Sequence, residues 1–291
     1  MIFIKNLTGI LMNLEMCFIR QMMNKRLRKT CTRRKKVILE LSFIMMTVFS
    51  LIVKVCIDRG NIMTEMNKPV ILAFPLRGEW LSPNTPGTKI PSHGTDRFGT
   101  RYAYDFIQVD WDRGGYPAYR VSFIQYLLFG VKLENYYCWG QDVYAPCNGI
   151  VVTAEDGYEE RSKTNLFSDM SNAYKNAHYF NIEKDDIQSV AGNYIIIKFG
   201  DGIYAALCHL QTGSIQVSVG QEVTKGEIIG KVGHSGNSFA QHLHFQLMDS
   251  SDIASANGVP CAFEEYELFE NGKWKRVKNG IPTDKDRIRF Q

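Results

Sequence analysis

Two histidines, His242 and His244, stand two residues apart in the run 236–247. An alternation of apolar and polar residues continues from them through Leu247, and this pattern predicts a strand. Residues two apart on a strand point to the same face, so the two imidazoles would lie side by side. Two imidazoles on one face make half of a metal site. The plain alternative is two unrelated histidines on a polar sheet face.

Three further residues could complete such a site. His209 ends an apolar run that follows the turn Gly200-Asp201-Gly202, and His93 lies twelve residues before Asp105. Asp105 belongs to the aromatic stretch 102–107, which predicts a strand. An unpaired buried carboxylate is costly, and a metal ion would give Asp105 a partner. Two His and one Asp with an open fourth position match a catalytic zinc site, because structural sites are closed and usually rich in cysteine.

Five blocks of sequence follow one another in a fixed order: His93 with the Asp105 strand, then 142–152, 192–210, 219–230 and 235–245. Together they resemble the lysostaphin-type (LytM-like) zinc metallopeptidases, a family of peptidoglycan endopeptidases. The resemblance covers residues 70–291 and is most specific from Gly192 to Phe245. It implies one Zn²⁺ per chain and hydrolysis of peptide bonds in peptidoglycan cross-links or stem peptides.

The resemblance also implies roles for individual residues. Carried over one by one, His93, Asp105 and His244 bind the zinc ion, and His209 and His242 are the catalytic residues. One imidazole can take a proton from water and return it to the leaving amine, and a second can stabilise the oxyanion. The division of these roles between His209 and His242 stays open.

Four other polar residues near these motifs need a prediction. Asn237 and His234, on the loop before the histidine pair, are candidates for contacts with the substrate. Asp96 is the alternative metal ligand, because the common family spacing is His-x-x-x-Asp. It lies in a polar, Gly-flanked loop that favours a solvated turn, so Asp105 is preferred. His178 lies in a polar insertion and is expected to be exposed.

Charge is distributed unevenly along the chain. The net charge is +4, but residues 1–60 hold 12 Lys/Arg against 3 Asp/Glu, whereas the remaining chain holds 22 against 27. The basic balance therefore belongs to the N-terminus. Nucleic-acid binding is not predicted, because no basic stripe with interleaved aromatic residues occurs beyond that region.

The N-terminal region predicts export or anchoring. Residues 1–36 form a basic leader expected in the cytoplasm, and 37–57 form an apolar segment that is either a signal or a signal-anchor. No small-residue cleavage site follows it, so an uncleaved membrane anchor is favoured. Basic residues stay inside, so the catalytic part would face outward, whether anchored or secreted.

Seven cysteines are present. Three, Cys17, Cys31 and Cys56, lie in the leader and the apolar segment, and the other four are Cys138, Cys147, Cys208 and Cys261. Disulfides would be permitted outside the cytoplasm, but the pairing among the four is open. Cys208 precedes His209, so strand alternation predicts that it faces the opposite side and packs in the core.

The elements predict an all-β fold. Runs 194–199 and 203–207 form one hairpin, 266–269 and 274–277 form another around Asn271-Gly272, and 214–219 and 227–232 add short strands. The natural architecture is an antiparallel β-sandwich-like core, and the resemblance implies the duplicated hybrid-motif or barrel-sandwich type. Insertions near 111–140 and 157–190 interrupt it. They could wall a substrate groove or simply pack on themselves.

Two other functions remain open at this stage. The first is a non-hydrolytic, wall-binding or hydrolase-regulating member of the same fold, which loss of a metal ligand would indicate. The second is a phosphocarrier domain that uses two histidines. The Asp ligand and the export leader argue against it. The sequence predicts no oligomeric state.

Overall fold

The computed structural model describes residues 69–165, 186–238 and 240–291. All of them lie within one compact unit, Arg59–Gln291. The predicted leader 1–36 and apolar segment 37–57 lie outside the described residues, as does His178. The division of the chain into leader, apolar segment and catalytic domain therefore stays a prediction.

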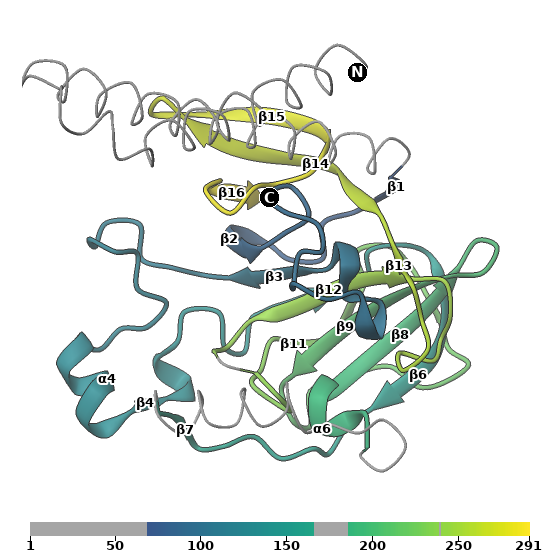
Figure 1. Ribbon diagram of the computed structural model, residues 1–291, viewed down its shortest axis with the longest axis horizontal. Helices are drawn as coiled ribbons and strands as arrows, with labels where there is room; N and C mark the ends of the chain where they lie inside the picture. Colours follow the sequence, from purple (N-terminus) through teal and green to yellow (C-terminus); the bar gives the residue numbers. More distant parts are fainter. Residues whose placement is uncertain (1–68, 166–185, 239) are drawn as a thin grey trace, which may run out of the picture. The chain divides into compact units, whose positions relative to one another are not determined.

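Strands make up most of the regular structure (Figure 1). They are β1 (Val70–Leu72), β2 (Gly78–Asn84), β3 (Tyr104–Ile107), β4 (Val131–Lys132), β5 (Asp142–Tyr144), β6 (Gly149–Glu155), β7 (Lys163–Thr164), β8 (Asn193–Phe199), β9 (Ile203–Leu210), β10 (Glu222–Val223), β11 (Ile228–Lys231), β12 (Leu243–Met248), β13 (Gly258–Val259), β14 (Cys261–Glu270), β15 (Lys273–Gly280) and β16 (Ile288–Phe290). The prediction of a mostly β fold is confirmed.

Helices are short. They are α4 (Phe123–Phe129), α6 (Gln188–Ala191) and the 3₁₀ segments η1 (Arg97–Tyr102) and η2 (Leu133–Asn135). The Ser122 hydroxyl accepts a hydrogen bond from Gln125 N at the start of α4, which is the usual N-cap contact. Across the three described ranges, every helix falls short of the length and apolar character that a membrane span needs.

One large sheet dominates the described residues. Its strand order is β1-β14-β16-β2-β3-β12-β9-β8-β6-β10, with β13 on β12 and β15 on β14. The β1–β14 pair is parallel, and the other pairings within the described residues are antiparallel. Strand β12 lies between β3 and β9 (Figure 1). His244 on β12 therefore lies between the strands that carry Asp105 and His209.

The sequence of β8 explains why this sheet is buried. Its residues Asn193–Ile197 are buried without interruption, so the strand is covered on both faces. Ile195 and Ile197 pack into the main core, whereas Tyr194 and Ile196 pack into a second cluster. A continuous apolar run is what a strand covered on two sides requires.

Both predicted hairpins are confirmed. Strands β8 and β9 pair antiparallel around the turn at Gly200–Gly202, and β14 pairs with β15 around Asn271-Gly272. The strand predicted at 214–219 is wrong, because no named strand occurs there. Gln216 N donates to Ile229 O and Val217 is buried in the main core, so this segment packs without a regular ladder.

Aromatic side chains fill the main core. The Phe263 ring on β14 is fully buried and lies edge-on to those of Phe74 and Tyr104, at centroid distances of 5.0 and 5.1 Å. Edge-to-face packing of this kind adds stability beyond the area that is buried.

Phe263→Ala should therefore lower the free energy of unfolding by about 3–5 kcal/mol, because it removes a large buried ring and leaves a cavity. The measurement is urea unfolding monitored by tryptophan fluorescence. Phe123→Ala on α4 is the matched control, since Phe123 is 61% exposed and its loss should change stability by less than about 0.5 kcal/mol. Equal losses in the two variants would contradict this account of the core.

The insertion near 111–140 forms a small core of its own. Tyr126, Val131 and Tyr136 are buried together, and Tyr119, Trp139 and other partly buried residues pack against them. Ala240, two residues before His242, belongs to the same cluster. The aromatic residues of this insertion thus pack on one another and also on the loop that leads into β12.

The four cysteines of the described chain, Cys138, Cys147, Cys208 and Cys261, are free and buried. Cys208 is 4% exposed and packs in the second cluster, as predicted for a core residue. The predicted opposite face is wrong, because Cys208 lies directly opposite His244 on β12 and so shares its face of the sheet.

Candidate active site

Strand register brings the key side chains onto one row. Asp105 on β3 lies directly opposite His244 on β12, and Asn84 on β2 lies opposite Asp105 from the other side. Residues directly opposite on paired strands share a sheet face. The row therefore sets a carboxylate between an imidazole and a carboxamide.

Asp105 is the centre of this cluster. Its Oδ2 lies 3.0 Å from His93 Nε2 and accepts a hydrogen bond from Asn84 Nδ2 at 2.7 Å. Its Oδ1 lies 2.9 Å from His244 Nδ1 and 3.3 Å from His242 Nε2. Burial would raise the pKa of the Asp105 carboxyl, but the charges of His242 and His93 and the hydrogen bonds outweigh it and hold the pKa well below its usual value.

His93 reaches the cluster from the loop before η1. Its ring lies edge-on to that of His244, with centroids 4.9 Å apart. Asp96, the alternative ligand, is instead bound to Arg101 at 2.6 Å with a side chain that is 64% exposed. Asp105 therefore shares a site with His93. Asp96 lies instead in an exposed turn, as its sequence predicts.

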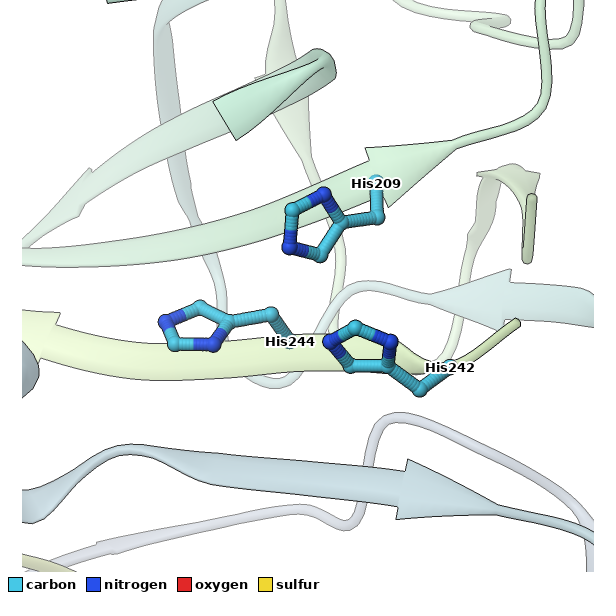
Figure 2. Close-up of side chains that lie close together, drawn as sticks. All are labelled: His209, His242 and His244. Carbon is cyan, nitrogen blue, oxygen red and sulfur yellow. The ribbon is translucent and has the colours of Figure 1, made fainter. Parts of the chain in front are cut away.

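His209 and His242 face each other across the same site (Figure 2). Their ring centroids are 4.7 Å apart, and His209 lies 5.9 Å from His244. Strand alternation alone would put His209 on the face of Leu207, in the main core. A left-handed backbone at His209, with φ of +61°, breaks that alternation and turns its ring toward the other two.

Hydrogen bonds decide which nitrogen of each imidazole carries the proton. His209 Nδ1 lies 2.9 Å from Ser235 O, and His242 Nδ1 lies 2.6 Å from Ala240 O. A carbonyl oxygen can only accept, so each Nδ1 donates, and in the neutral ring each Nε2 keeps its lone pair.

The two remaining histidines follow the same rule. His244 Nε2 lies 2.8 Å from Gln246 Oε1, which leaves the lone pair on Nδ1. His93 Nδ1 lies 3.0 Å from Ser92 Oγ, whose own proton goes to Thr100 O, so the lone pair of His93 is on Nε2. In the neutral rings, the free nitrogens of His93, His242 and His244 thus face Asp105, and His209 lies beside His242.

Residues 181–256 match the model of peptidase family M23. The chain carries a peptidase family M23 domain. The matched range contains His209, His242 and His244, whereas His93 and Asp105 lie before it. The sequence-based identification of the family is confirmed.

Several proteins are similar to parts of this chain. Endolysin 2638A of Staphylococcus phage 2638A is 34% identical over 108 residues, which cover 34% of this chain and 22% of the endolysin. Peptidoglycan DD-endopeptidase ShyA of Vibrio cholerae is 38% identical over 58 residues, or 20% of this chain and 13% of ShyA. Each match thus spans less than a quarter of the relative's length. Among solved structures, the catalytic domain of lysostaphin from Staphylococcus simulans is 20% identical, with a TM-score of 0.30 over 62% of this chain and 88% of that domain.

The M23 site is suited to a cation. The ligand atoms of His93, Asp105 and His244 lie within 4.8 Å of one another, and so do those of His209, His242 and His244. When these rings are neutral, a lone pair on His244 Nδ1 or His93 Nε2 repels a carboxylate oxygen at about 3 Å, and a proton or a metal ion between the two atoms removes this repulsion. A divalent ion held by two imidazoles and a carboxylate removes both repulsions.

His209 and His242 differ in proton affinity. Burial and the nearby His242 and His244 lower the pKa of His209 well below its usual value. Burial would also lower the pKa of His242, but the charge and hydrogen bond of Asp105 outweigh it and raise that pKa. Two titratable groups with divergent pKa values are what an acid–base pair requires.

Arg161 makes hydrogen bonds to the loop that precedes the histidine pair in this M23 domain. Its guanidinium donates to His234 Nε2 and to Ser238 O, both at 2.9 Å. His234 is buried, and burial together with the charge of Arg161 lowers its pKa to about 3. Asn237 is half-buried and its backbone N donates to Val190 O. Contacts of His234 and Asn237 with substrate stay a prediction.

Sequence reasoning missed two residues of the site, Asn84 and Gln246. Gln246 could have been found, because it stands two residues after His244 and so shares its face of β12. Asn84 carries no such signal, since its place opposite Asp105 depends on the pairing of two strands that are distant in sequence.

Proposed function

We propose that this chain is a zinc-dependent endopeptidase that hydrolyses peptide bonds in peptidoglycan cross-links or stem peptides. One observation carries the proposal: His93, His242 and His244 each place a ring nitrogen within 3.3 Å of the buried Asp105 carboxylate, and the His209 ring lies beside that of His242. The M23 domain supports hydrolysis of a peptide bond, and the name of the Vibrio cholerae relative supports peptidoglycan as the substrate.

In this proposal His93 Nε2, His244 Nδ1 and the Asp105 carboxylate hold one zinc ion. Bound zinc supplies a Lewis acid that polarises the scissile carbonyl and acidifies water. Asn84 donates to Asp105 Oδ2 and so fixes the orientation of that carboxylate.

His209 and His242 handle the protons. Since a backbone carbonyl holds Nδ1 of each ring, Nε2 of each is the atom that accepts or returns a proton. One of them takes the proton of the attacking water and delivers it to the leaving amine. The other, with a proton on Nε2, donates to the oxyanion of the tetrahedral intermediate and so stabilises it. Which histidine does which stays open.

The surroundings of the site complete the proposal. The 111–140 insertion, which packs against Ala240, would form one wall of the substrate groove, with His234 and Asn237 near the substrate. The finer fold assignment is a barrel-sandwich core. The apolar segment 37–57 would anchor the chain in the membrane, with the catalytic domain outside the cytoplasm, or would direct secretion.

The test is mass spectrometry of fragments released from purified peptidoglycan by the whole chain. With zinc we expect fragments with new amino termini, which name the bond that is cut. Treatment with a chelator should abolish their release, and added zinc should restore it. No release by a sample that carries one zinc per chain would contradict hydrolysis and favour the non-hydrolytic, wall-binding alternative.

A further inference from the structure

A buried chain of hydrogen bonds runs from the backbone of η1 to His244. Gln246 Nε2 donates to Phe98 O at 2.7 Å, and Gln246 Oε1 lies 2.8 Å from His244 Nε2. Gln246 is 2% exposed and His244 is 9% exposed, so bulk water does not compete for these contacts. The other ring nitrogen, Nδ1, faces Asp105 Oδ1 at 2.9 Å.

The contact between Gln246 and Phe98 O fixes which group donates in each of these hydrogen bonds. The Phe98 carbonyl can only accept, so the amide nitrogen of Gln246 must face it. The amide oxygen then faces His244 and accepts a proton from Nε2. This leaves Nδ1 with its lone pair, directed at Asp105 and the space that His93 also lines. A backbone carbonyl thus determines, through one side chain, which imidazole nitrogen can bind a metal.

The backbone around Phe98 is shaped for this contact. Phe98 and Gly99 both have left-handed conformations, with φ of 60° and 72°. A Cβ at Gly99 would lie 3.0 Å from Gln246 Nε2 and 2.9 Å from Met248 Cγ. The absence of a side chain at Gly99 therefore lets the turn approach β12 closely enough for Phe98 O to reach the amide.

We propose that Gln246 is a positioning residue that holds His244 in the Nε2-protonated tautomer and so presents Nδ1 to the metal. The inference rests on the proposed metal centre. An outer hydrogen bond of this kind orients a histidine ligand and raises its basicity, and its loss typically costs roughly 10–100-fold in metal affinity.

Two substitutions separate hydrogen bonding from packing. Gln246→Met fills a similar volume with an unbranched chain but removes both the donor and the acceptor. Gln246→Glu loses the donor to Phe98 O and keeps an acceptor for Nε2–H. Gln125→Met on α4 is the matched control, because Gln125 is exposed and lies outside the site.

Zinc affinity of the whole chain is measured by competition with a chromophoric chelator. We expect Gln246→Met to bind zinc roughly 10–100-fold more weakly than the wild type. Gln246→Glu should lose less, and Gln125→Met should lose nothing. The melting temperature of each metal-free protein shows whether it is folded, and Gln246→Glu carries the test if Gln246→Met does not fold.

The second readout needs no zinc. Imidazole ¹⁵N chemical shifts of the metal-free protein report which ring nitrogens of His244 carry a proton: Nε2 should be protonated in the wild type, and in Gln246→Met the proton should move to Nδ1, which faces Asp105. An unchanged tautomer or an unchanged zinc affinity in Gln246→Met overturns the inference. A wild-type chain that binds no zinc overturns the proposed function instead, so the two failures are distinguishable.

Discussion

Replacing either His209 or His242 with alanine should lower kcat/KM for peptidoglycan by roughly 10²–10⁴-fold, the usual contribution of a positioned acid or base. Zinc should remain bound if His93, Asp105 and His244 hold it as proposed, whereas loss of zinc would assign the ion to the alternative group His209, His242 and His244. The measurement pairs the rate of release of new amino termini with the zinc content of the same sample.

Glutamine variants test whether the effect comes from proton transfer. Gln at position 209 can still donate to Ser235 O but cannot accept a proton at neutral pH, so His209→Gln should be as inactive as His209→Ala. Recovery of activity in His209→Gln would assign the residue a packing role instead. If the two histidines act as a unit, the double alanine variant should lose little more than either single variant.

Replacing Asp105 with asparagine should abolish high-affinity zinc binding, and activity should be lost with it. The change keeps the shape of the side chain but removes the charge that three imidazoles face. We expect the zinc affinity to fall by more than the roughly 10–100-fold that loss of an outer hydrogen-bond partner costs. Both titration with a competing chelator and the stability gained from zinc report this change.

The matched control is Asp96→Asn, the same chemical change at the other candidate ligand. Asp96 is exposed and pairs with Arg101, and such a surface ion pair contributes at most about 1 kcal/mol. Zinc at a hundredfold excess over Kd should stabilise the Asp96→Asn protein by about 2.7 kcal/mol, as in the wild type. Asp105→Asn should gain far less. Loss of zinc by Asp96→Asn with retention by Asp105→Asn would reverse the assignment.

Local sequence patterns were sufficient to predict many of the strands and both hairpins. Alternation around His244 predicts β12, the Gly-Asp-Gly turn predicts the β8–β9 hairpin, and Asn271-Gly272 predicts the β14–β15 hairpin. Each signal depends on residues close together in the chain. The strand predicted at 214–219 does not form, because its apolar residues reach the core without a regular ladder to a neighbouring strand. Whether a segment has such a neighbour depends on the tertiary structure.

The candidate site divides in the same way. By itself, the sequence determined the residue types, the His-x-His spacing that puts two imidazoles on one face, and the preference for Asp105 over Asp96 in a polar turn. The tertiary structure decided three things that no local pattern carries. Strand register put Asn84 and His244 on either side of Asp105. A left-handed backbone turned His209 against the alternation of β9. Carbonyls distant in the sequence set the tautomers of His209, through Ser235 O, and of His244, through Phe98 O and the Gln246 amide. All three depend on hydrogen bonds between segments far apart in the chain, and these form only once the sheet has assembled.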